Sequence, residues 1–526
     1  MTINNDNKLN ARRRFLGSMG AIISAAAVGS RVIGSPAASR NLVPATPSKV
    51  PNYWCTWAAQ NYLYGQGATE LEVSTLEGAD GAAFARGLLN QKILLGDHGW
   101  AKTFHHRIRD ELYLLLDDGW EEGGTATFQL DRKKFPTFTG SAEQRLKALN
   151  KAVRADGWRA LALWCRNTPA GVGAEQCVSW SKFADVNYLK IDRGDQNGSF
   201  ARARSDQKAA ITLEHVYANE CLNGEWLYDG RFGVQPWGSP RLQVLRETDI
   251  YRTYDATAVL GVPTTLDRVA ELLKGASGHP EVQALLNVED EVYIAAVLGC
   301  SMGVMRHPMR GLRPGTDPDL FFPPPRQLKQ RMDEVVRAVR WQRIAPPYSA
   351  GKGSIVLDAE ILTDEWVFGR DDTFDPDVAG KRARQGAPAR LARNMELPVV
   401  SCEGEAPYVL CNRFPGGAAA IGALERVSVE RQAYQPLARV RWMLDDASGP
   451  FGIFGQFGSL TLVFERPLRP GRILAQDLAA DVSIDITDDV RINRSEITIP
   501  GELINRVGRL SATINDDSMP GLVLTI

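Results

Sequence analysis

The sequence predicts an α/β fold: a (β/α)8 TIM barrel followed by a C-terminal all-β domain with the pattern of a sandwich. Three observations lead to this prediction. The chain has 526 residues, and one hydrophobic core rarely serves more than about 250–300 residues. Residues 52–345 alternate short apolar runs with helix-like segments, whereas residues 350–526 hold short runs of alternating polarity between turn residues. We therefore expect one domain in each of these two ranges.

The barrel prediction rests on eight apolar runs of about five residues each, the usual length of a strand. Helix-like segments separate several of them, which is typical of βαβ units and a parallel sheet. Eight such units in about 290 residues match the size of a closed barrel. The predicted strands are 53–59, 112–116, 160–165, 186–191, 211–217, 242–246, 284–288 and 302–306.

Helical spacing is clearest in AEQRLKALNKAVRADG, residues 142–157. Its apolar residues Leu146, Leu149 and Val153 recur at helical intervals, and Gly157 stands where a C-cap is expected. SDQKAAI and TLDRVAELLKG have the same character. The stretch PPRQLKQRMDEVVRAVRWQRI predicts a last barrel helix before a Pro/Gly hinge at 345–352.

The predicted β domain contains the runs GSIVLDAEIL, APYVLCNRF, ARVRWMLD, SLTLVFE, VSIDITDDVRI, SEITIPG and LVLTI. Turn residues separate them, as in a β-sandwich. The polar segment 370–395 predicts a long loop. Because the hinge before the domain is short, we expect contact with the barrel. A structural role is favoured, and a separate binding module is the alternative.

The N-terminus has the features of an export signal. A basic patch, a short apolar run rich in Gly and Ala, and the small-residue stretch SPAAS follow one another. Arg12 and Arg13, followed one residue later by Phe15 and Leu16, resemble a twin-arginine signal. We expect residues 1–38 to be this signal, residues 39–51 to be a linker, and the mature protein to be periplasmic or secreted. A disordered basic tail is the alternative.

Charge and cysteine content narrow the possible partners. A net charge of -1 gives no electrostatic reason to expect nucleic acid or an anionic membrane. No later apolar run is long enough to predict a membrane span. The seven Cys residues include no CxxC pair, which argues against a zinc ribbon or a thioredoxin-type site. Cys402 and Cys411 either bridge a hairpin or remain reduced.

Acidic and aromatic residues gather at the predicted strand ends. The carboxyl ends of barrel strands meet on one rim, where active sites of this fold lie. One Asp at such a place is often only a helix cap, but here the pattern repeats with Lys, Arg and Trp beside it. The residues, in strand order, are Trp54 and Trp57; Asp117, Asp118 and Trp120; Trp164; Lys190, Asp192 and Arg193; Glu220 and Trp226; Arg246, Glu247 and Asp249; and Glu289 and Asp290.

This residue set suits glycoside hydrolysis. A retaining enzyme needs two carboxyl groups about 5–5.5 Å apart, one as nucleophile and one as proton donor. Lys190 and Arg193 would keep a neighbouring nucleophile ionised. The adjacent Asp117 and Asp118 would accept hydrogen bonds from neighbouring sugar hydroxyls, and the Trp rings would offer flat stacking faces.

Three motifs together resemble the glycoside hydrolase clan of the α-galactosidases, families 27 and 36. LLLDDGW resembles the sugar-binding motif of that clan, NYLKID its nucleophile motif and LRETDI its acid/base segment. The resemblance covers roughly residues 52–345, and this clan also has a β domain after its barrel. It implies that Asp192 is the nucleophile and Asp249 the acid/base. The sugar-binding residues that it implies are Asp117, Asp118, Lys190 and Arg246.

The predicted function is thus an exported retaining exo-α-glycosidase, with α-galactoside-like substrates first. Arg193, Gly194 and Asp195 depart from the usual continuation of the nucleophile motif, so a different sugar is an alternative. A second is a non-catalytic carbohydrate-binding barrel. A redox enzyme is disfavoured, because no GxGxxG follows a strand and no CxxCH occurs.

The sequence indicates no cofactor. A metal site among Asp97, His98, His105 and His106 is possible by composition. However, adjacent histidines on a helix point about 100° apart. We therefore interpret these histidines as packing or surface residues.

Overall fold

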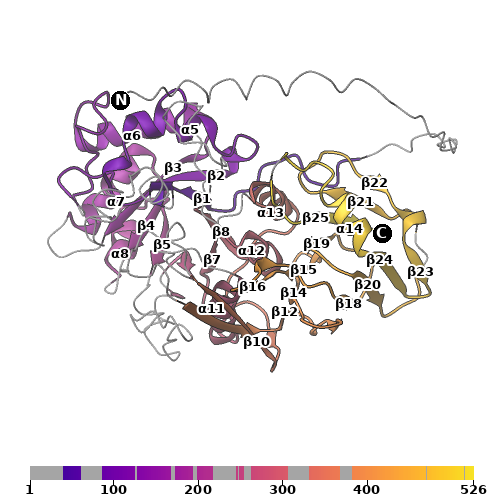
Figure 1. Cartoon of the computed structure of the whole chain (residues 1–526). Helices are drawn as coiled ribbons and strands as arrows, with labels where there is room; N and C mark the ends of the chain where they lie inside the picture. Colours follow the sequence, from indigo (N-terminus) through magenta and orange to yellow (C-terminus); the bar gives the residue numbers. More distant parts are fainter. Residues whose placement is uncertain are drawn as a thin grey trace, which may run out of the picture. The chain divides into compact units, whose positions relative to one another are not determined.

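The computed structural model describes one compact unit, Arg40–Ile526 (Figure 1). The described residues are 40–526 except for 58, 61–85, 125–126, 167–171, 193–197, 217–244, 247, 254–261, 306–330, 368–381, 469–470 and 515.

Eight parallel strands close into a barrel in chain order, and β8 pairs with β1. The predicted fold class is confirmed. The strands are β1 (Asn52–Cys55), β2 (Leu112–Leu116), β3 (Ala160–Arg166), β4 (Tyr188–Asp192), β5 (Thr212–Val216), β6 (Ile250–Arg252), β7 (Leu285–Glu289) and β8 (Ser301–Val304).

Seven predicted strands overlap observed ones, but the sixth is wrong. The run 242–246 was predicted as this strand, yet Leu245 and Arg246 are helical, and β6 is Ile250–Arg252. Both segments are short and partly apolar, so composition does not show which one is the strand. Strand pairing identifies Ile250–Arg252, because Ile250 lies beside Glu214 on β5 and beside Leu285 on β7.

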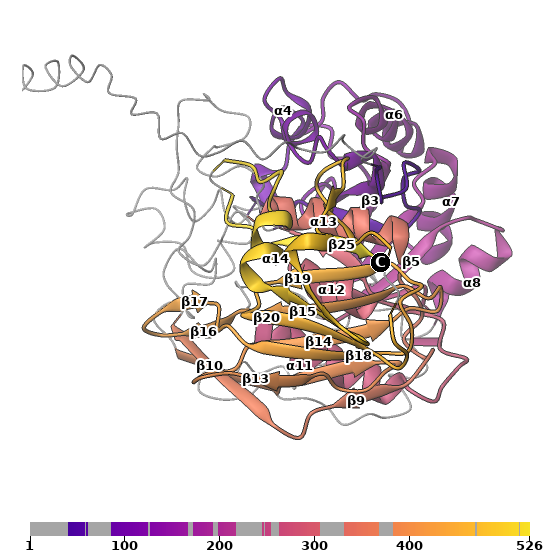
Figure 2. The ribbon, with the colours of Figure 1, turned by 90° about the vertical axis from the view of Figure 1, so that its right-hand side faces the viewer.

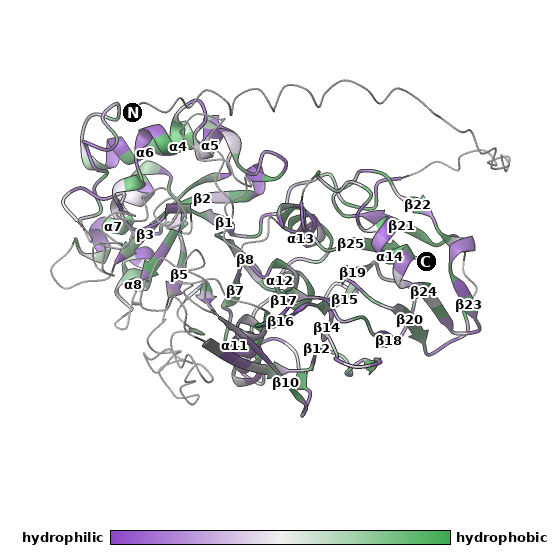
Figure 3. Cartoon of the chain, in the orientation of Figure 1, coloured by the Kyte–Doolittle hydropathy of each residue, from purple (hydrophilic) through white to green (hydrophobic). Residues whose placement is uncertain are grey.

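Helices surround the barrel, and their apolar faces pack on it. Helix α6 follows the predicted range closely and begins with a capping box formed by Ser141 and Gln144. Figure 3 shows hydrophilic and hydrophobic residues along α6, as expected of an amphipathic surface helix. The described helices here are α4 (Gln91–Leu95), α5 (Trp100–Thr103), η1 (Arg109–Glu111), α6 (Ala142–Ala155), α7 (Ala174–Ala184), α8 (Ser199–Asp206), α11 (Val262–Ala276), α12 (Val292–Leu298) and α13 (Met332–Ile344).

The described residues of the C-terminal part form strands and two short helical segments, η4 (Thr487–Asp489) and α14 (Gly501–Val507). An eight-stranded sheet has the order β22-β21-β25-β19-β15-β14-β12-β9, and a five-stranded sheet has the order β13-β18-β20-β24-β23. The predicted loop at 370–395 is wrong in part, because β11 and β12 lie within it.

Two hairpins, β10-β11 and β16-β17, complete this part. The strands are β9 (Ile355–Leu357), β10 (Ile361–Val367), β11 (Arg382–Pro388), β12 (Arg390–Arg393), β13 (Val399–Ser401), β14 (Tyr408–Arg413), β15 (Ala419–Leu424), β16 (Arg426–Ser428), β17 (Gln432–Tyr434), β18 (Arg439–Leu444), β19 (Phe451–Gly455), β20 (Ser459–Phe464), β21 (Leu474–Asp477), β22 (Ile484–Asp485), β23 (Arg491–Asn493), β24 (Glu496–Pro500) and β25 (Gly521–Thr525).

The central strands of the eight-stranded sheet, β14, β15 and β19, are buried. Val409 and Cys411 on β14 belong to the core between the two sheets, whereas Leu410 between them belongs to the barrel core. Strands β14, β15 and β19 contact α12, and β25 contacts α13, as Figure 2 shows. Close approach requires glycine here, since a Cβ on Gly452 would lie 3.0 Å from the Trp341 ring of α13. The sheet is therefore part of the barrel's own packing.

Buried charges join the same two parts. Arg337 on α13 binds Asp477 on β21, with Nε–Oδ1 at 2.8 Å and both side chains fully buried. Arg331, which precedes α13, binds Glu425 in the β domain and Glu291 and Glu334 in the barrel. Removing one member of a buried pair leaves the other charge uncompensated, so these contacts make the two parts depend on each other.

The segment predicted as a linker also contacts both parts. Gln476 of β21 accepts a hydrogen bond from the backbone of Leu42 at 2.6 Å. Glu111 of the barrel accepts one from the backbone of Ser48 at 2.5 Å. Residues 40–51 are thus fixed to the fold at both ends.

The described cysteines carry free thiols. Cys402 and Cys411 are both unbridged, and each donates to a backbone carbonyl, of Gly404 and Glu396 respectively. Of the two alternatives for this pair, the reduced state is the one observed. None of the described helices is long and apolar enough to cross a membrane.

Arg337→Ala should strongly destabilise the protein, because Asp477 would remain buried without its counter-charge. We expect a loss of about 3–5 kcal/mol in the free energy of unfolding, measured by urea denaturation. The matched control is Arg441→Ala, which breaks the exposed pair with Glu496 and should cost less than about 1 kcal/mol. Equal losses in both variants would contradict the structural role of the buried pair.

Candidate active site

Strand alternation decides which side chains face the inside of the barrel. Tyr53 and Cys55 on β1 and Ala162 and Trp164 on β3 belong to one interior cluster. Trp164 lies beside Lys190 of β4, and Lys190 beside Glu214 of β5. The interior therefore changes from aromatic to charged side chains toward the carboxyl ends of the strands.

Asp117 directly follows β2 and is held by three donors. Lys190 Nζ lies 2.6 Å from its Oδ2, and Cys55 Sγ donates to the same oxygen at 3.1 Å. The backbone N–H of Asp118 donates to Oδ1 at 2.8 Å. Burial alone would raise the pKa of Asp117, but the charge and hydrogen bond of Lys190 outweigh it and hold the pKa below its ordinary value.

Asp118 has a cation of its own. Arg86 Nε lies 2.7 Å from its Oδ2. Burial raises the pKa of the Asp118 carboxyl, and Arg86 opposes this only in part. Lys134 supports the turn by donating to the backbone carbonyls of Gly119 and Arg86. The two adjacent carboxylates thus coexist because each pairs with a different cation.

Asp192 is the last residue of β4 and is partly exposed. It lies two residues after Lys190, so strand alternation puts both on the inner face, about 7 Å apart along the strand. Its neighbours in register are Arg166 on β3 and Val216 on β5. Asp192 therefore stands at the rim, above the charged layer that holds Asp117.

A buried carboxyl group lies below this layer. Glu214 accepts hydrogen bonds from Tyr53 at 3.1 Å and from Tyr188. Burial raises the pKa of Glu214 most strongly, and the nearby charge of Arg252 opposes this rise. Burial also raises the pKa of both tyrosines well above the ordinary value, so they remain donors.

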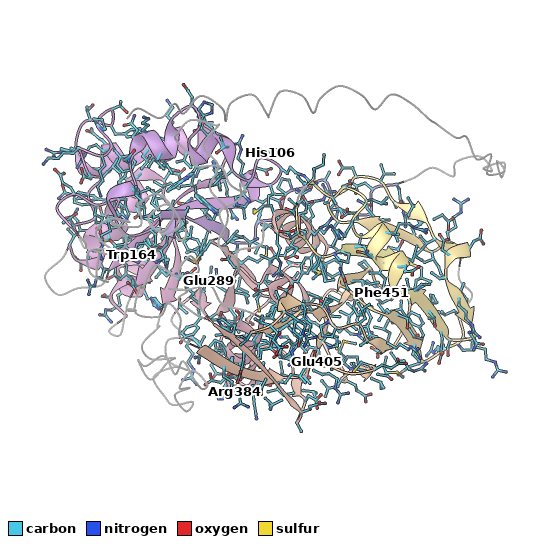
Figure 4. All side chains as sticks on the ribbon, in the orientation of Figure 1. His106, Trp164, Glu289, Arg384, Glu405 and Phe451 are labelled. Atoms are coloured by element: carbon cyan, nitrogen blue, oxygen red, sulfur yellow. The ribbon has the colours of Figure 1, made fainter. Side chains whose placement is uncertain are left out.

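The far side of the rim holds a further ion pair. Arg252, the last residue of β6, binds Glu289, the last residue of β7, and both are buried. Figure 4 shows Glu289 and Trp164 on the barrel strands. Asp290, the next residue, accepts a hydrogen bond from the backbone of Met305 at 2.8 Å and so joins the ends of β7 and β8.

The four predicted sugar-stacking tryptophans divide into two groups. Trp164 and Trp57 pack with the interior cluster. The expectation for Trp54 is wrong: it faces outward and packs against Trp100 and Phe104, because alternation puts it opposite to Cys55.

Trp120 is likewise misplaced by the prediction. It is fully buried, and its Nε1 donates to the carbonyl of Trp164 at 2.9 Å, so it braces the end of β3.

Asp249 and Arg246 are also wrongly placed by the prediction. Both precede β6, so they lie at the amino ends of the strands, opposite to Asp117 and Asp192. Asp249 Oδ2 binds Arg204 and the backbone N–H of Leu213, which precedes Glu214 on β5.

Arg246 binds Glu281 at 2.6 Å on the surface, in the turn before β7. The structure therefore brings together Asp117, Asp118, Trp164, Lys190 and Asp192. Arg246 and Asp249 lie at the opposite end of the barrel.

Four predicted rim residues lie outside the described part of the chain: Arg193, Glu220, Trp226 and Glu247. Among the described residues, no three His, Cys, Asp or Glu side chains are grouped to hold a metal ion. His105 is buried against Trp54, and this burial lowers its pKa to about 3.

Sequence reasoning missed Cys55, Arg86, Glu214 and Arg252. A strict count of alternate residues along each strand finds three of them, since Cys55 follows Tyr53 by two, Glu214 follows Thr212 by two and Arg252 follows Ile250 by two. No local pattern marks Arg86, which reaches Asp118 from a distant segment.

No family model matches the chain, and no curated protein matches it. A family 27 β-L-arabinopyranosidase from Geobacillus stearothermophilus, solved as a variant with arabinose, is similar at 7% identity with a TM-score of 0.38; the match covers 91% of this chain and 98% of that one. A second β-arabinopyranosidase shows 10% identity and a TM-score of 0.27, over 78% and 56% of the two chains. Both TM-scores are low, so function has to be argued from the residues of this chain.

Lys190→Met removes the cation beside Asp117 and leaves that carboxyl buried. The pKa of Asp117 should then rise above its ordinary value of about 3.9, because burial disfavours the charged form. In the wild type the depressed pKa adds stability above about pH 4, and this is lost as the pH falls through the folded-state pKa. The stability difference between variant and wild type should therefore be largest at neutral pH and shrink in acid.

Urea unfolding at neutral and acidic pH measures this difference. Lys102→Met is the control, because it breaks only the exposed pair with Asp97. A stability loss in Lys190→Met that stays the same at both pH values would contradict the pairing with Asp117.

Proposed function

We propose that this protein is a glycoside hydrolase that removes a terminal sugar with retention of configuration. The observation that carries the proposal is the buried Lys190–Asp117 pair with Asp192 next on the same strand face. This arrangement provides a rigid acceptor for sugar hydroxyls beside a partly exposed carboxylate at the rim of the barrel. It agrees with two of the three motifs of the resemblance, those that contain Asp117, Asp118, Lys190 and Asp192.

Asp117 and Asp118 would bind adjacent hydroxyls of the sugar ring. Each carboxylate accepts bonds from its own protein donors and retains lone pairs for further donors. Because Lys190 and Arg86 fix their positions, little ordering remains to be done when the sugar binds. Trp164 in the interior cluster would form the apolar wall of the same pocket.

Asp192 would be the nucleophile. Nucleophilic attack on the anomeric carbon requires the ionised carboxylate, which nearby cations favour. Lys190, two residues earlier on the same inner face, is the cation that would favour this ionised form. The covalent glycosyl-enzyme would then be hydrolysed by water.

We do not propose Asp249 as the proton donor, because that residue lies at the amino ends of the strands. We infer Asp255 instead, which follows the last residue of β6 by three positions in the sequence. Arg252 and Asp255 repeat the order, Arg then Asp, that the acid/base motif requires. Asp255 lies outside the described residues, and its assignment rests on its place in the sequence.

We retain α-galactoside-like sugars as the first substrates to test and export by a twin-arginine signal as the route out of the cytoplasm. The rival proposal is a non-catalytic barrel that binds a glycan, and both proposals use the same sugar site. Release of sugar from a glycoside separates them.

Asp192→Asn should lower turnover by at least roughly a thousandfold while the protein stays folded, because the amide cannot form the covalent intermediate. Asp255→Asn should also lose most activity on substrates with a poor leaving group. The measurement is a panel of nitrophenyl α- and β-glycosides with circular dichroism of each variant.

Asp249→Asn is the matched control, since its side chain binds only structural partners at the other end of the barrel. It should keep most of the activity. If Asp249→Asn were inactive and folded while Asp192→Asn remained active, the proposed site would be at the wrong end.

A further inference from the structure

Arg166, the last residue of β3, lies on the inner face of the barrel at its rim. Ala162 and Trp164 on this strand belong to the interior cluster, and Arg166 follows them at the next alternate position. It lies beside Asp192 in register. Its side chain is mostly shielded from solvent.

The guanidinium of Arg166 forms no hydrogen bond and no close ion pair among the described residues. Its Nε is inaccessible to solvent and forms no hydrogen bond, and no ion pair of at most 4.0 Å joins it to Asp118 or Asp192. An N–H group withdrawn from water without an acceptor is costly. The other rim cations differ in this respect, since Lys190, Arg86 and Arg252 each bind a carboxylate.

Positive charge gathers on this side of the rim. The charges of Arg86 and Arg166 both act to lower the pKa of Asp118, against the effect of burial. Burial lowers the pKa of Lys134; the carboxylates of Asp131 and Asp118 oppose this change, and the charge of Arg86 adds to it. Asp118 is bonded to Arg86, so it is not a hydrogen-bond acceptor for Arg166. Once Asp192 is esterified to a sugar, the second acidic neighbour of Arg166 also loses its charge.

We propose that Arg166 binds an anionic substituent of the sugar, so that the substrate is a glycoside of an acidic sugar. The proposal rests on the proposed glycosidase function and adds the chemical class of the sugar. A carboxylate or a sulfate ester would provide the missing acceptor. A carboxylate matches the planar fork of a guanidinium with two parallel hydrogen bonds, which Lys does not reproduce.

The test compares matched pairs of nitrophenyl glycosides that differ only in the acidic group. The pairs are α-galactoside with α-galacturonide, and α-galactoside with its sulfate ester, assayed with wild type, Arg166→Gln and Arg166→Lys. Arg132→Gln is the control, because Arg132 is an exposed arginine paired with Glu122. The wild type should have the higher kcat/KM on one of the acidic substrates, and the identity of that substrate distinguishes carboxylate from sulfate.

Arg166→Gln should lower kcat/KM on the acidic substrate by roughly tenfold to a hundredfold, the size of one charge-assisted contact, and leave the neutral one nearly unchanged. Arg166→Lys should recover only part of the loss. Equal losses on both substrates, or a shift of the acidic limb of the pH profile without a change in preference, would overturn the proposal and make Arg166 a residue that only keeps Asp192 ionised.

Failure of the proposed glycosidase function can be distinguished from failure of the inference about Arg166. A wild type inactive on every glycoside would contradict hydrolysis itself. Calorimetric titration with galacturonic acid and with galactose then tests Arg166 alone. Tighter binding of the acid, lost in Arg166→Gln, supports the inference, and equal binding of the two sugars overturns it.

Discussion

The buried ion pair between Lys190 and Asp117 is the constraint on which the rest of the site depends. The lysine lies on β4 and the carboxylate follows β2, so they meet only when both strands pair with β3. An unpaired lysine at this depth would either lose its proton or destabilise the fold. The ion pair thus links the pairing of these three strands to the formation of the candidate active site.

Buried charges elsewhere in the barrel also need partners, and acidic and basic side chains alternate from strand to strand. After Asp117 and Lys190 come Glu214 on β5, Arg252 on β6 and Glu289 on β7. Each buried charge has an opposite charge or a hydrogen-bond donor beside it. Two further side chains lie at the rim: Arg166, whose buried Nε forms no hydrogen bond among the described residues, and the partly exposed Asp192. Reaction and recognition are proposed at these two positions.

The C-terminal domain supports this arrangement from outside. Strand β25 covers α13, and α13 joins the two parts through Arg337 and Arg331. α12 follows β7 directly, with only Asp290 and Glu291 between Glu289 and the helix. The β domain therefore packs against α12, the helix that begins just after Glu289 at the end of β7. This contact favours a structural role for the β domain over that of an independent binding module.

Much of this could be predicted from the sequence, and the failures have physical reasons. Seven barrel strands were found because apolar runs and helical spacing are local signals. β6 was missed because it has three residues, too few to show alternation, and this error carried Asp249 and Arg246 to the wrong end of the barrel. Trp54 was misassigned because composition does not reveal which face of a strand a residue occupies. Arg86 could not be found, since its contact with Asp118 exists only after folding.

The most direct test of the account is to trap the covalent intermediate. The wild-type protein would be incubated with a fluorinated glycosyl fluoride, which forms the glycosyl-enzyme faster than it is hydrolysed, and the labelled peptide would be identified by mass spectrometry. The account predicts one sugar per chain, attached to Asp192. A label on another carboxylate, such as Glu289, or inversion of configuration without any label, would contradict the assignment of Asp192 as the nucleophile of a retaining enzyme.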